Sequence, residues 1–230
     1  MFMRRKLTSF CPSFVCAMPS LNMAHPRRFR TYKVRKNASV NCEIWEAARA
    51  TTAAPTFFKS ISIGEPGQAK EEFIDAGIRC NNPVKEVMEE AILVFTDERR
   101  VGCIVSIGTG HPSTISLPEP DAFQKILPLN LIGVLKDIAT DCEETGVELT
   151  RRFQDREDTY YRFSVTHGAG QISLEEWKKM GEVTTHTKSY LEDPLVSKKV
   201  DSVVKVLCSS RALTDVPERE YATLADICTS

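Results

Sequence analysis

The sequence lacks a long apolar run, and this limits how it can meet a membrane. No hydrophobic stretch approaches the roughly 18 residues that a membrane-spanning helix needs. The first 20 residues are basic and then mildly apolar, but polar residues and Pro12 interrupt them, so they fit neither a signal peptide nor an anchor. A mitochondrial presequence remains the alternative. The composition, 42% hydrophobic and 27% charged, is that of an ordinary globular protein. We expect a cytoplasmic protein.

The spacings that bind metals are also missing. None of the eight cysteines forms C-x-x-C, and no pair of histidines has ligand spacing, so we expect neither a metal nor another cofactor. Cys103 lies inside an apolar, strand-like run, and Cys142 lies on a helical apolar stripe. Such positions are typical of buried free thiols in a reducing compartment.

Acidic residues are absent from the first 42 positions, which carry nine of the 30 Lys and Arg residues. The rest of the chain therefore holds 21 basic against 31 acidic side chains. The basic stretch 26–36 could attract anionic headgroups and give peripheral membrane contact. The alternative, a solvated edge of the fold, is the favoured interpretation. Aromatic signatures of RNA binding are missing nearby, so we expect no nucleic-acid partner.

Two common catalytic and nucleotide-binding motifs are absent or incomplete. The G-x-S-x-G elbow of many serine hydrolases occurs nowhere. Ser106 in VSIGTG is its nearest imitation and would be the first candidate in a cryptic site, while His111 beyond it is more typical of a solvated loop residue. Gly108 and Gly110 form G-x-G, but Ser113 stands where a dinucleotide fingerprint needs its third glycine. Close backbone packing at a strand end is the expected use of these glycines, and a nucleotide site is the least favoured.

Short apolar runs alternate with helical patterns along the chain. The runs predict strands at 13–18, 72–75, 101–110 and 159–165, and the third has the continuous pattern of a fully buried parallel strand. Helices are expected at 41–55, from 82, at 126–153, after a capping box of Ser173 and Glu176, and at 197–210. The alternation predicts a layered α/β fold with a largely parallel sheet. We place a domain over 1–192, followed by a helical and then polar tail over 193–230.

The helix after residue 82 has a clear expected start. Asn82 fits the N-cap, and Pro83 fits the first helical position. An apolar stripe at helical spacing follows, formed by Val84, Val87, Met88 and Ala91.

The stretch EEFIDAGIRCNNP, residues 71–83, places a lone carboxylate, Asp75, at the end of a short strand. Reactive groups in α/β sheets gather on loops at the carboxyl ends of strands. The small residues Ala76 and Gly77 would let a substrate or another side chain reach this carboxylate. The alternative is a turn aspartate that bonds its own backbone, which the local sequence alone favours.

Three segments in order, IWEAARATTAAPTFF, FIDAGIRCNNP and VSIGTG, resemble the patatin-like phospholipase family, most closely its fungal members. The resemblance implies a three-layer α/β/α sandwich, incomplete at its N-terminal side, that hydrolyses acyl esters of glycerolipids or phospholipids with a Ser-Asp dyad. Asp75 matches the dyad aspartate, in a turn supported by Ala76 and Gly77. By this resemblance Asp75 is the general base that contacts the serine hydroxyl.

The chain departs from the family upstream of residue 44. Family members carry a glycine-rich oxyanion loop and the G-x-S-x-G serine there, and this sequence contains neither motif. We therefore expect a base without a nucleophile, and little or no esterase activity from this chain. One hypothesis is a partial chain of a lipid acyl hydrolase. The other is a non-catalytic remnant that binds lipid or a protein partner, and in either case an open sheet edge should expose apolar surface.

Overall fold

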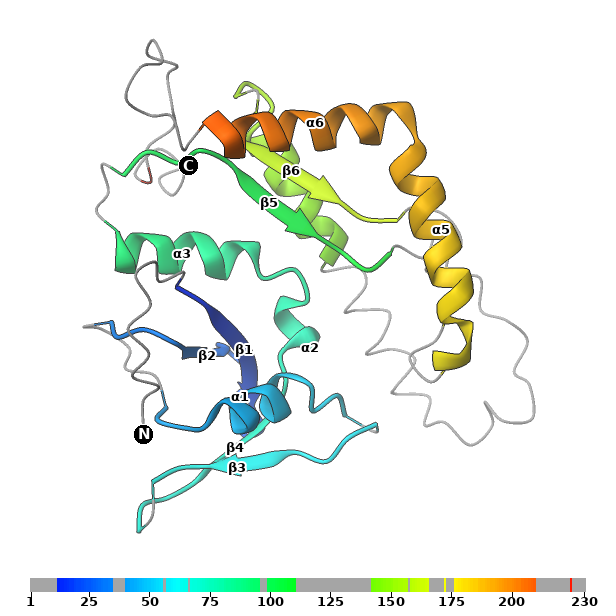
Figure 1. The fold of residues 1–230 in the computed structure, drawn as a ribbon. Helices are drawn as coiled ribbons and strands as arrows, with labels where there is room; N and C mark the ends of the chain where they lie inside the picture. Colours follow the sequence, from blue (N-terminus) through cyan, green and yellow to red (C-terminus); the bar gives the residue numbers. More distant parts are fainter. Residues whose placement is uncertain are drawn as a thin grey trace.

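The computed structural model describes residues 12–34, 40–55, 57–65, 67–95, 99–110, 142–156, 158–165, 172, 176–209 and 224. Within them, two separate sheets and their helices form a mixed α/β structure (Figure 1). The predicted α/β class is confirmed at this level, and the three-layer arrangement remains an expectation from the family resemblance.

The first sheet has four strands in the order β2-β1-β4-β3, and all of its pairings are antiparallel. The strands are β1 (Phe14–Pro19), β2 (Arg27–Arg30), β3 (Ile61–Ile63) and β4 (Glu71–Asp75). Their positions confirm the strands predicted at 13–18 and 72–75. The antiparallel pairing contradicts the expected largely parallel sheet, because β1–β2 and β3–β4 join through loops without a crossover helix.

Helix α1 (Ile44–Thr51) packs on one face of this sheet. A capping box of Glu43 and Glu46 opens the helix, so the cap predicted near Asn41 is wrong by two positions. Ala50 is fully buried and lets the helix approach the strands closely. Beneath it, the rings of Phe29 and Phe73 meet edge to face with their centroids 5.1 Å apart.

The second sheet pairs β5 (Ile104–Ile107) with β6 (Tyr160–Phe163) in parallel, which confirms the parallel strand predicted within 101–110. Full burial of that strand was wrong, since the side chain of Ile107 is 79% exposed. Among the described residues β5 pairs with β6 alone, so its other edge has no described partner strand. The open sheet edge expected from the missing family segment remains a prediction.

Helix α3 (Val84–Val94) lies between the two sheets (Figure 1). Val84 and Met88 of its predicted stripe are buried against Leu149 of the helical segment 142–152 and against Phe153, which follows this segment. That segment is the described part of the helix expected at 126–153, and the remainder lies outside the described residues. The short helix α2 (Gly77–Cys80) connects β4 to this region.

The C-terminal part of the described chain is helical. A 3-10 turn, η3 (Trp177–Lys179), leads into α5 (Met180–Glu192), and α6 (Pro194–Ser209) follows at once. Val203 and Val206 of α6 are buried, and this helix contacts β6. Ser173 of the predicted capping box lies outside the described residues. The division of the chain at residue 192 remains a prediction.

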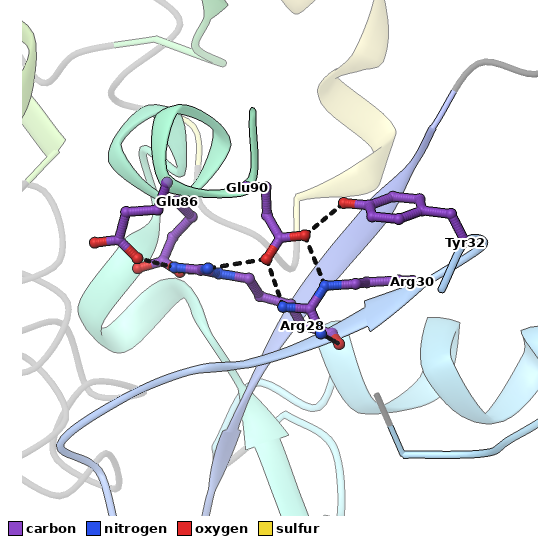
Figure 2. Close-up of polar contacts among 6 residues, drawn as sticks. Arg28, Arg30, Tyr32, Glu86 and Glu90 are labelled. Atoms are coloured by element: carbon purple, nitrogen blue, oxygen red, sulfur yellow. Dashed lines mark hydrogen bonds and ion pairs between the residues drawn. The ribbon is translucent and has the colours of Figure 1, made fainter. Parts of the chain in front are cut away.

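The basic stretch around residue 28 forms a buried ion cluster with α3. This β2–α3 ion cluster consists of Arg28, Arg30, Tyr32, Glu86, Glu89 and Glu90 (Figure 2). Glu90 accepts hydrogen bonds from Arg28 Nη1 at 2.9 Å, from Arg30 Nε at 2.6 Å and from Tyr32 Oη at 2.6 Å. Burial alone would raise the pKa of Glu90, but the three donors outweigh it and hold that pKa at about 2.

These contacts correct the interpretation of two residues of the basic stretch. The side chains of Arg28 and Arg30 are neither a solvated edge nor a free basic face, because glutamates of α3 bind them in the interior. Membrane contact through the stretch 26–36 remains a prediction. Arg27 also forms an ion pair, with Glu71 at 3.1 Å. No helix in the described part of the chain has the length and apolarity needed to cross a bilayer.

Candidate functional site

Asp75 is the last residue of β4 and sits opposite Ala17 of the central strand β1. Its backbone N–H donates to the carbonyl of Ala53 at 3.0 Å, which ties the strand end to the segment after α1. The side chain is half-buried. The predicted place of this carboxylate, at the carboxyl end of a strand, is confirmed.

The turn after Asp75 holds one carboxylate oxygen. Asp75 Oδ1 accepts a hydrogen bond from the Gly77 N–H at 2.7 Å, so the local turn bond offered as the alternative interpretation does exist. A Cβ at Gly77 would lie 3.1 Å from the same oxygen, which explains the need for a small residue there. Ala76 is buried. Among the described residues, no donor contacts Asp75 Oδ2, so this oxygen is free to accept a proton.

Burial raises the pKa of Asp75 above the usual value for an aspartate, and the Gly77 N–H offsets part of this rise. The apolar surroundings disfavour the charged form, whereas the amide favours it. A carboxylate with a raised pKa is a better proton acceptor at neutral pH than an ordinary aspartate.

Ser106 lies on β5, in the other sheet, and the structure does not pair it with Asp75. Its hydroxyl donates to Asn82 Oδ1 at 3.0 Å and accepts from Arg162 Nη1 at 3.0 Å. The acceptor of the Ser106 hydrogen bond is therefore the neutral amide of Asn82, which cannot act as a base. Because a serine nucleophile needs a base at its proton, Ser106 lacks the partner for that role.

The contacts of Asn82 correct its predicted function as the cap of α3. The N-cap residue of α3 is Pro83, and the Asn82 side chain instead bonds Ser106 and donates to the Cys142 carbonyl at 3.4 Å. The Asn-Pro pattern predicts only contacts with neighbouring residues, whereas Ser106 and Cys142 lie 24 and 60 residues further along the chain. Sequence reasoning also missed Arg162, for which no local signal exists.

The glycines after β5 have the packing role that the sequence favoured. A Cβ at Gly108 would lie 2.6 Å from Arg162 Nη2, so the guanidinium occupies the space above this glycine. Gly110 has a φ of 138°, which favours glycine. His111 lies outside the described residues. In the described chain no three His, Cys, Asp or Glu side chains converge to hold a metal ion.

Comparison with known proteins relates the chain to patatin-like phospholipases. Residues 12–88, which include Asp75, match the family model described as Patatin-like phospholipase. A protein named Patatin-like phospholipase 1 from Plasmodium falciparum is 25% identical over 83% of this chain and 32% of its own length. The human calcium-independent phospholipase A2-gamma is 28% identical over 74% of this chain and 20% of its own length.

The chain thus spans about a third or less of these relatives. A Caenorhabditis elegans intracellular phospholipase A2 is likewise covered over 18% of its length, at 28% identity. No solved structure matches the chain. The closer likeness to fungal members remains a prediction.

Proposed function

We propose that this chain is part of a lipid acyl hydrolase domain of the patatin-like type, and that Asp75 is its general base. The substrates would be carboxylic esters of phospholipids or other glycerolipids. The observation that carries the proposal is the Asp75 carboxylate, half-buried at a strand end, where Gly77 binds Oδ1 and no described residue donates to Oδ2. This carboxylate lies within the segment that matches the family.

The free oxygen suits a serine dyad. A serine hydroxyl beside Oδ2 would give up its proton to Asp75 while its Oγ attacks the ester carbonyl. The proton would then pass to the departing alcohol, leaving an acyl-serine. Asp75 would next take a proton from water, which attacks the acyl group; the proton returns to the serine Oγ as the fatty acid is released. The raised pKa of Asp75 favours the two steps in which this carboxylate takes up a proton.

The nucleophile of this reaction would come from a segment that the 230 residues do not contain. The Ser106 hydroxyl is hydrogen-bonded to Asn82 and Arg162, and no G-x-S-x-G occurs in the sequence. Oxyanion donors, worth about 10² to 10³ in rate, would come from that segment too. The 230-residue chain by itself should therefore be inactive toward esters.

A second candidate function is binding without catalysis, to lipid or to a protein. This candidate is favoured for the isolated chain, because the Ser106 hydroxyl is already hydrogen-bonded to Asn82 and Arg162. Peripheral membrane contact through residues 26–36 belongs to the same proposal. Arg28 and Arg30 are buried with glutamate partners, so such contact would depend on the other basic residues of the stretch.

The test is to extend the chain by the coding sequence in frame upstream and to measure phospholipid and p-nitrophenyl ester hydrolysis. We expect a G-x-S-x-G in that extension and activity that Asp75→Asn lowers by about 10² to 10⁴. Glu72→Gln, an exposed carboxylate on the same strand, is the matched control and should leave activity unchanged. An extension without the motif, or activity indifferent to Asp75→Asn, would refute the proposal and favour binding without catalysis.

A further inference from the structure

An apolar pocket of about 410 Å³ lies between α3 and β5, and no residue of the Asp75 turn lines it. We infer that it binds a single-chain anionic amphiphile, such as a fatty acid, with the chain along α3 and the head group at Arg99 and Arg100. The inference stands on the pocket alone and does not depend on the proposed hydrolase activity. The volume is within the range of roughly 300 to 1,000 Å³ that small-molecule sites occupy.

One wall of the pocket follows α3 over most of its length. Val84, Val87, Met88 and Ala91 line it at helical spacing. A helix of 11 residues is about 16 Å long, so the wall offers a long, narrow surface and not a round cavity. An extended hydrocarbon chain fits such a surface, and burying it there removes apolar area of both partners from water.

The opposite wall comes from β5 and from a distant part of the chain. Val105 and Ile107 of β5 line it, and Ile107 is 79% exposed. Leu224 closes the wall and is held in place by a hydrogen bond from its N–H to the Arg99 carbonyl at 3.1 Å. Exposed aliphatic surface on both sides of a slot is the feature that an apolar ligand would cover.

The two ends of the pocket differ in charge. At the end near the C-terminus of α3, Arg99 and Arg100 line the pocket, and neither forms an ion pair with a residue that the structure describes. The guanidinium of Arg99 lies 5.7 Å from the centre of the Phe95 ring, which also lines the pocket and keeps this charge beside it. Two cations without carboxylate partners are suited to a carboxylate or phosphate head.

The other end offers no place for a charged head. Asn82 and Ser106 are buried there and already bond one another. Arg162 donates to Ser106 Oγ and contacts Cys142 Sγ at 3.1 Å, and it is not among the residues that line the pocket. The amphiphile is therefore oriented with its tail toward Ser106 and its head toward Arg99.

Competition binding on the intact 230-residue chain tests this assignment. The probe is a dansyl-labelled fatty acid, and the competitors are palmitate, lysophosphatidate and hexadecanol, each below its aggregation concentration. We expect both anions to displace the probe at least about tenfold more strongly than the neutral alcohol. Stronger displacement by palmitate identifies a carboxylate head, and stronger displacement by lysophosphatidate a phosphate head.

Two variants separate the head site from the chain site. R99Q/R100Q should weaken palmitate about tenfold and leave hexadecanol unchanged, whereas K198Q/K199Q, which removes two exposed charges from α6, should change neither. Ala91→Trp should fill the slot and abolish binding of both. Equal displacement by palmitate and hexadecanol, or an arginine variant that binds palmitate as the wild type does, would overturn the inference. The R99Q/R100Q variant tests whether these arginines bind the head group even if Ala91→Trp fails to fold.

Discussion

Replacing Glu90 with glutamine tests how strongly the β2–α3 ion cluster holds its two elements together. The Glu90 side chain is 3% exposed, and those of Arg28 and Arg30 are 10% and 4% exposed. Glutamine keeps the size of the side chain but removes the charge that both guanidinium groups face. Each arginine then remains in the interior with part of its charge uncompensated. Breaking a buried pair in this way costs about 3 to 5 kcal/mol of unfolding free energy.

The lowered pKa of Glu90 is consistent with an effect of this size. Its hydrogen-bond donors hold the pKa at about 2, against the ordinary value of 4.5, and this difference corresponds to about 3 kcal/mol. Because the folded pKa is the lower one, this stabilisation is complete above pH 4.5 and is lost as the pH falls through 2. At pH 3 about 2 kcal/mol of it should already be gone.

Urea unfolding, followed by far-ultraviolet circular dichroism at pH 7 and pH 3, measures both effects. The difference between wild type and Glu90→Gln should be about 3 kcal/mol at pH 7 and about 1 kcal/mol at pH 3. Glu89→Gln is the matched control, since Glu89 pairs with Arg28 but is 65% exposed and should contribute under about 1 kcal/mol. The reasoning is refuted if the two variants cost the same at pH 7, or if the Glu90 difference does not shrink at pH 3.

Three further substitutions test packing. Gly108→Ala should destabilise the fold by about 1 to 3 kcal/mol in thermal or urea unfolding, because its Cβ would meet Arg162; a neutral effect would argue against that contact. Gly181→Ala, in α5 with open space around it, is the opposite case and should be neutral or stabilising by up to about 1 kcal/mol, so a clear loss would contradict it. Phe73→Ala should cost about 3 to 5 kcal/mol through the cavity left beside Phe29, and a cost below about 1 kcal/mol would mean the site collapses.

Local patterns in the sequence were enough to locate most elements. The apolar run at 13–18, the short strand that ends at Asp75 and the parallel strand that precedes Gly108 all appear where their periodicity and flanking residues placed them. The position of Asp75 at a strand end, and the bond from Gly77, also follow from residues adjacent in sequence. Such features depend on neighbours only, so a single sequence contains them.

Features that depend on distant partners could not be predicted in this way. The arginines of 26–36 look like a basic face until α3, about 60 residues later, supplies the glutamates that bind them. Asn82 looks like a helix cap until Ser106 and Arg162 are brought beside it. The predicted strand direction was wrong in the four-stranded sheet for the same reason, since the alternation of elements does not specify which edges pair.

Fluorophosphonate labelling of the purified 230-residue chain, with mass mapping of any adduct and an Asp75→Ala control, shows whether this chain has the base of a serine hydrolase without its nucleophile. We expect no labelled serine in a sample that unfolds cooperatively, because the Ser106 hydroxyl is bound to Asn82 and Arg162. Labelling of Ser106 that disappears in Asp75→Ala would contradict this expectation and would show that this chain assembles a complete dyad.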